Sequence, residues 1–175
     1  MNFVEHMTWH MALVTVLAPA AAATVRGTRF DPVRAAPAAF SPLAACLIDF
    51  IVVWAWHAPP LHQAARHDAG WFALEQLSFA AAAIYLWLSI LGGDAAARHS
   101  RQAAGVVALV LTFAHMTMLG ALIALAPRDI YEHGGGALAG QQRGGAIMLL
   151  AGTTIYPVAA VWLSRSLLTR VRSGA

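Results

Sequence analysis

The sequence predicts an all-α fold: a polytopic membrane helical bundle with about five transmembrane helices and a periplasmic N-terminus. Composition and the spacing of apolar stretches predict the bundle, and the distribution of arginine predicts its orientation. Hydrophobic residues make up 59% of the 175 residues and charged residues only 11%, whereas soluble domains have roughly 25% charged residues. Apolar stretches of roughly 20 residues, the length needed to cross the hydrocarbon core, recur along the chain.

These stretches define one transmembrane domain over residues 1–175, because the connections are short and no change in composition marks a second domain. The expected spans lie at about 3–25, 38–57, 71–91, 103–126 and 144–165. Helix-breaking residues lie between them, including Gly27 with Pro32, Pro59-Pro60, Gly92-Gly93 and Gly134-Gly135-Gly136.

The first stretch ends in small residues of the kind found at signal-peptide cleavage sites, Ala18 to Ala23. A signal peptide begins with positive charge, whereas here Glu5 and two histidines precede the apolar part and the first arginine, Arg26, follows it. We therefore expect the first stretch to be a retained helix.

Arginine falls mainly on one side of the expected bundle. One side carries Arg26, Arg29, Arg34, Arg98, Arg101, Arg165, Arg170 and Arg172, and the other carries Arg66, Arg128 and Arg143. Because arginine-rich connections stay in the cytoplasm, we expect a multi-pass protein of the bacterial inner membrane with its N-terminus outside.

Two classes of site are disfavoured. The single cysteine, Cys46, excludes an intrachain disulfide and any site built from several cysteines. The net charge is only +3 and the arginines lie between apolar segments, so contact with membrane lipid explains them and nucleic-acid binding is not supported.

Histidine and methionine cluster at the start of the first span. His6 and His10 lie four residues apart and Met7 and Met11 repeat this spacing, so each pair stacks on one helix face. Imidazole and thioether groups bind copper, and sulfur favours Cu(I). The alternative that stays open is a pair of interfacial histidines beside methionines that fill core space.

Further candidate metal ligands lie near the same outer end. His57 ends the second span, and the prolines after it fix the exit of the chain, so we expect His57 to face the cavity of the first-span histidines. His62 and His67 in a predicted loop, and His133 before the last span, are supporting candidates, although loop histidines are often simply solvated.

His115 lies near the middle of the fourth span, where an imidazole needs a partner. Met118 is one turn away and Met116 is on an adjacent face, so a copper path from the outer end is one interpretation. The other is a neutral histidine that hydrogen-bonds to Asp49 or Glu75. These two carboxylates could also carry protons.

In their order, these segments resemble the CtaG family of multi-span cytochrome c oxidase assembly proteins. Residues 6–11 are similar to that family's His-Met-x-x-His-Met helix start, and Trp56-His57-Ala58-Pro59 to its Trp-His-x-Pro. Other matches are His115-Met116 with Leu119-Gly120, Tyr131, and the run from Gln142 to Met148. The chain resembles a short member with about five spans. Where the family often has histidine in the third helix, this chain has Glu75 and Gln76, so a carboxylate would partly replace a nitrogen ligand.

The resemblance implies a membrane-embedded assembly factor for haem–copper oxidase that binds or delivers copper, with Cu(I) favoured, through histidine and methionine at the periplasmic side. Implied partners are an oxidase subunit or other assembly factors within membrane lipid, and a homo-oligomer is left open. No catalytic residues are expected, so the chain is not expected to be an enzyme.

Three other functions stay open: a b-type haem protein, a copper or proton-coupled transporter, and a structural assembly subunit without metal. Haem would require His10 or His57 to face His115 across one iron, whereas the sequence places them at least two turns apart in depth.

Overall fold

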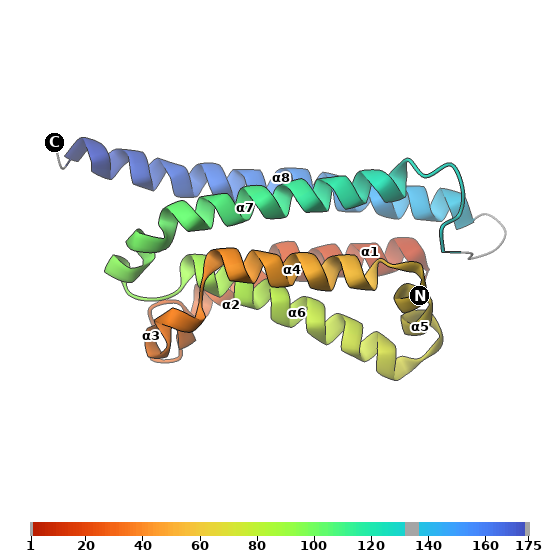
Figure 1. Cartoon of the computed structure of the whole chain (residues 1–175), viewed down its shortest axis with the longest axis horizontal. Coiled ribbons are helices and arrows are strands. Elements are labelled where there is room, and N and C mark those ends of the chain that lie inside the picture. Colours follow the sequence, from red (N-terminus) through yellow and green to blue (C-terminus); the bar gives the residue numbers. More distant parts are fainter. Residues whose placement is uncertain (1, 132–136, 174–175) are drawn as a thin grey trace.

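The computed structural model describes residues 2–131 and 137–173, and only the backbone of residue 97 and of residues 166–173 (Figure 1). These residues form helices and no strand. The elements are α1 Phe3–Ala12, a π-helical turn Leu13–Leu17, α2 Ala18–Val25, α3 Pro32–Ala35, the 3₁₀ turn Pro37–Ala39, α4 Pro42–Trp56, α5 Pro59–His67, α6 Ala69–Leu91, α7 Ala95–Ala124 and α8 Ala137–Ser173. The fold is the all-α polytopic membrane bundle that the composition predicts.

Within the described residues, four helical segments are each long and apolar enough to cross a membrane. They are Phe3–Val25, Ala69–Leu91, Arg98–Ala124 and Ala137–Arg165. They correspond to the first, third, fourth and fifth predicted stretches. The last two begin several residues earlier than predicted, because helix continues through polar residues next to the apolar run.

The second predicted stretch, 38–57, contains α4, which meets the next helix, α5, at 71°. With 15 residues, α4 is about 22 Å long and shorter than a bilayer core of about 30 Å. The prediction of a loop after Pro59 was wrong, because proline suits the first position of a helix, where its missing N–H is not needed. His62 and His67 therefore lie on a helix.

Helices α7 and α8 lie side by side, α1 packs against α8, and α4 contacts both α6 and α7 (Figure 1). Glycine brings α7 and α8 together: a Cβ on Gly145 would lie 2.5 Å from the backbone N of Ala124, and one on Gly120 would lie 2.9 Å from the N of Leu149. Without these side chains, the two backbones touch, as at other membrane helix interfaces.

The two ends of the bundle differ in chemistry. The histidine end, on the right in Figure 1, carries the start of α1, α5 and the start of α6. The arginine end, on the left, carries α3 and the connection between α6 and α7. There Asp31 joins two segments, because Oδ2 accepts hydrogen bonds from the N–H groups of Gly27 (2.6 Å) and Gly93 (2.8 Å), while Oδ1 accepts from Val33 (3.0 Å).

Candidate metal centre

A hydrogen-bonded cap fixes the start of α1 and so the position of its histidines. Asn2 Oδ1 accepts from the backbone N–H of Glu5 at 2.9 Å, and Glu5 Oε2 accepts from the backbone N–H of Asn2 at 2.9 Å, forming a capping box. One turn further, His6 and His10 both face α6, as their spacing predicts.

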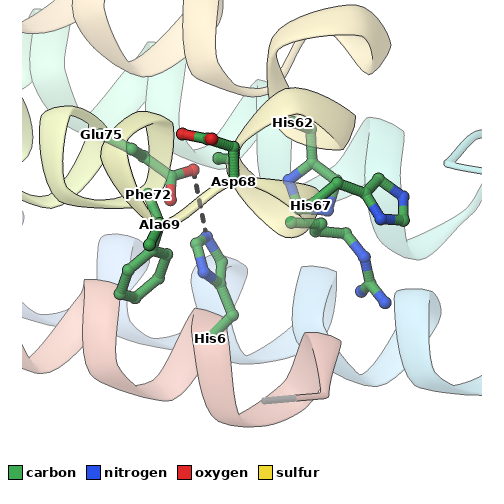
Figure 2. Close-up of a pocket in the computed structure, with 9 residues that line it drawn as sticks. His6, His62, His67, Asp68, Ala69, Phe72 and Glu75 are labelled. Atoms are coloured by element: carbon green, nitrogen blue, oxygen red, sulfur yellow. Dashed lines mark ion pairs between the residues drawn. The ribbon is translucent and has the colours of Figure 1, made fainter.

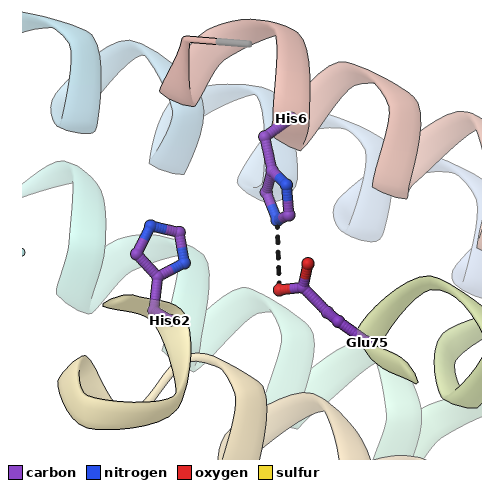
Figure 3. A group of neighbouring side chains, drawn as sticks. All are labelled: His6, His62 and Glu75. Atoms are coloured by element: carbon purple, nitrogen blue, oxygen red, sulfur yellow. Dashed lines mark ion pairs between the residues drawn. The ribbon is translucent and has the colours of Figure 1, made fainter. Parts of the chain in front are cut away.

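Three side chains from three helices converge at the histidine end (Figure 3). His6 Nε2 on α1 lies 3.4 Å from Glu75 Oε1 on α6, and the His6 ring centroid lies 5.6 Å from that of His62 on α5. One ligand atom from each residue lies within 4.8 Å of the others, and all three side chains are buried. We call His6, His62 and Glu75 the mouth cluster.

A neighbouring amide positions the carboxylate of the mouth cluster. Gln76 Nε2 donates to Glu75 Oε2 at 3.1 Å, while Oε1 faces His6. Gln76 thus occupies one carboxylate oxygen and leaves the other directed at the imidazole. This arrangement resembles the outer hydrogen bonds that orient metal ligands.

A pocket of about 560 Å³ lies beside the mouth cluster (Figure 2). Besides the cluster, it is lined by Ala65, Arg66, His67, Asp68, Ala69 and Phe72. Arg66, His67 and Asp68 are exposed, so the pocket connects the buried cluster with the surface.

A second histidine pair lies next to the mouth cluster. The ring centroids of His10 on α1 and His57, at the end of α4, lie 5.7 Å apart. Both side chains are buried, and the ring of Phe79 lies 4.0 Å from His10 and 6.2 Å from His57. This confirms that His57 faces the histidines of the first span. We call His10 and His57 the inner pair.

Tyr131, in the connection after α7, contacts His62 of the mouth cluster and the backbone of His57. Its ring centroid lies 4.3 Å from that of His62, and its hydroxyl donates to the backbone carbonyl of His57 at 3.2 Å. Burial raises the pKa of Tyr131 above its ordinary value, so the hydroxyl keeps its proton and stays a donor.

His115 lies apart from the mouth cluster, between α4 and α7. Its Nε2 is 3.3 Å from Asp49 Oδ2, and its ring packs edge-on against Phe50. The sequence predicted either Asp49 or Glu75 as the partner of His115. In the structure His115 pairs with Asp49, and Glu75 pairs with His6.

The predicted methionine ligands are spread over several surfaces. Met7 and Met11 are buried, and Met7 packs against α8, because a Cβ on Gly144 would lie 3.0 Å from Met7 Cγ. Met116 is buried, whereas Met118 is 50% exposed on α7. A role as copper ligand therefore stays a prediction for all four methionines: Met7, Met11, Met116 and Met118.

His67 is exposed at the pocket and is not part of the buried clusters. His133 lies outside the described residues. His62 lies in the mouth cluster although the sequence predicted a loop there; Pro59 at a helix start was a usable signal. Gln141 was not predicted to have a role: its Oε1 accepts from the N–H of Ile130 at 2.8 Å and so holds the connection that carries Tyr131.

The cytochrome c oxidase caa3 assembly factor family, Caa3_CtaG, matches residues 1–170. The chain belongs to this family. No curated protein and no solved structure gives a significant match. As a Caa3_CtaG member, the chain is an assembly factor of cytochrome c oxidase and a multi-pass membrane protein, and the match includes every helix that contributes to the mouth cluster and the inner pair.

Proposed function

We propose that this Caa3_CtaG member binds copper at the mouth cluster and delivers it to a cytochrome c oxidase subunit. The observation that carries the proposal is the convergence of two imidazoles and one carboxylate, from three helices, within 4.8 Å beside an accessible pocket. Ionisable groups inside a membrane bundle commonly mark a functional site, and imidazole nitrogens with a carboxylate oxygen form a ligand set that a transition-metal ion accepts.

The spacing suits a metal after a small closure. Bonds from imidazole nitrogen or carboxylate oxygen to a transition metal are about 2 Å long, so two donors on one ion lie about 3–4 Å apart. His6 Nε2 and Glu75 Oε1 are already at 3.4 Å. Because no thiolate takes part, the ligands suit an ion that must later be released to another protein.

The direction of delivery follows from the arginine pattern. The histidine end would lie at the outer face of the bacterial inner membrane and the arginine end in the cytoplasm. Copper would then enter through the pocket from the periplasm, without crossing the membrane. The oxidase partner would dock at this end, where the mouth cluster is reached.

Copper binding is tested with full-length protein purified in detergent, loaded with Cu(I) and freed of excess metal. The test variant is His62→Gln/Glu75→Gln, and the matched control is His67→Gln, which changes an exposed histidine at the same pocket. We expect the control to retain as much copper as the wild type and the double variant to lose the copper of the mouth cluster. Equal copper in all three would contradict the proposal, and a Soret band in the visible spectrum would support haem instead.

A further inference from the structure

We infer that the inner pair, His10 and His57, is a second metal site, two-coordinate and selective for Cu(I), one helical turn deeper than the mouth cluster. The inference rests on the proposed copper function and adds a site with different ligands and a different preference for oxidation state.

The ring nitrogens of His10 are unsatisfied among the described residues. Its side chain is 0% exposed, and neither ring nitrogen has a hydrogen-bond partner within the part of the chain that the structure describes. A neutral imidazole carries one N–H and one lone pair, and burying both without partners costs free energy. Buried polar groups of this kind need an explanation, and a bound ion supplies one.

A hydrogen bond fixes the orientation of the His57 ring. Its Nδ1 lies 2.7 Å from the carbonyl oxygen of Val53, so Nδ1 carries the proton and donates. The lone pair is therefore on Nε2, which is buried and has no hydrogen-bond partner among the described atoms. Histidines that bind metals usually donate their other N–H to a carbonyl or carboxylate in this way. His57 is thus oriented as a ligand before any ion arrives.

The separation of the two imidazole rings fits one ion between them. With metal–nitrogen bonds of about 2 Å, two imidazoles bound in line to one ion have ring centroids about 6 Å apart. The centroids of His10 and His57 are 5.7 Å apart. The Phe79 ring packs against both imidazoles, so part of the shell around the pair is apolar.

The ligand set determines which ion this site takes. Two neutral nitrogens in a shell that is partly apolar suit Cu(I), which has a single charge and accepts two ligands in line. A divalent ion there would have too few ligands and twice the charge to bury. The mouth cluster, with its carboxylate and its pocket, accepts divalent ions more readily. Because His6 lies one turn from His10, Cu(I) can pass from one site to the other along α1.

The test counts ions and measures their coordination in full-length protein loaded anaerobically with Cu(I) or with Zn(II). For Cu(I), we expect two ions in the wild type. In His62→Gln/Glu75→Gln, one Cu(I) ion should remain, and X-ray absorption should show two nitrogen ligands. In His10→Leu/His57→Leu, one Cu(I) ion should also remain, with a higher coordination number. Zn(II) should fill only the mouth cluster. The His62→Gln/Glu75→Gln protein reports binding at the inner pair while both inner ligands are present. The test therefore remains valid even if His10→Leu/His57→Leu does not fold.

Two results would overturn the inner site. Either His10→Leu/His57→Leu, shown to be folded, binds as much Cu(I) as the wild type, or Zn(II) fills two sites. Loss of all copper from His62→Gln/Glu75→Gln would also overturn it and would leave the mouth cluster as the only site. If instead that variant keeps every bound ion, with two-nitrogen coordination, the inner site stands and the proposed role of the mouth cluster fails.

Discussion

The imidazole of His115 lies 3.3 Å from the carboxylate of Asp49 in the interior of the bundle, where the two side chains are only 7% and 3% exposed. The pair joins α7, which packs against α8, to α4, the helix that directly precedes His57. Ionisable groups at such a depth need each other, so the pair contributes to the way these helices assemble.

We expect Asp49→Leu to destabilise the protein by about 1–3 kcal/mol, because it leaves the His115 nitrogen buried without its partner. The double variant Asp49→Leu/His115→Leu should recover part of this loss, since both polar groups are then removed. Thermal unfolding in detergent gives the comparison. Additive losses in the double variant would show that the two residues do not interact.

Asp31 should make stability depend on pH in the acid range. Burial raises the pKa of this carboxyl, but hydrogen bonds from Gly27, Gly93 and Val33 and the charge of Arg34 outweigh burial and hold the pKa below its usual range. A carboxyl with a lowered folded pKa stabilises fully above its ordinary value of about 4, and this stabilisation is lost as pH falls through the folded value. Asp31→Asn should therefore melt lower than the wild type at neutral pH, with a difference that shrinks below about pH 4.

The control for this prediction is Asp94→Asn, which removes an exposed carboxylate that pairs with Arg34 at 2.9 Å. Exposed pairs contribute little, so its melting temperature should stay close to that of the wild type. A difference between Asp31→Asn and the wild type that is constant from neutral to acid pH would refute the pH dependence.

Gln76 should tune the mouth cluster without being a ligand. Gln76→Leu removes the amide that donates to Glu75 Oε2, so the carboxylate loses its orientation toward His6. We expect copper affinity to fall roughly 10-fold, with the number of bound ions unchanged. Competition with a coloured Cu(I) chelator measures the affinity. If the variant binds one ion fewer, instead of the same number with lower affinity, Gln76 is itself a ligand.

Two glycines of α8 should respond oppositely to alanine. A Cβ on Gly145 would lie 2.5 Å from the backbone of Ala124, whereas one on Gly140 meets nothing within 4 Å. Gly145→Ala should separate α7 from α8 and lower the melting temperature. Gly140→Ala should leave it equal or higher, because alanine favours helix over glycine by up to about 1 kcal/mol. Equal melting temperatures for the two variants would show that the close approach is not required.

The sequence predicted the bundle well because membrane helices follow from apolar length, which is a local property of the chain. The pairing of His10 with His57 was also predictable, since helix period and the position of His57 before two prolines place both at one end. The approach of His6 and His62 to Glu75 was less predictable from the sequence, because it depends on the 71° bend between α4 and α5, which brings His62 toward α1. Asp31 was missed because its partners include Gly93, which is distant in sequence.

The most direct test of the copper role is the composition of the oxidase itself. In cells whose own copy of this chain is replaced, cytochrome c oxidase is purified and its ratio of copper to haem is measured with wild type, His62→Gln/Glu75→Gln and His67→Gln. We predict that the double variant yields oxidase with haem but a reduced copper content, while His67→Gln matches the wild type. An unchanged copper-to-haem ratio in the double variant would contradict copper delivery by the mouth cluster.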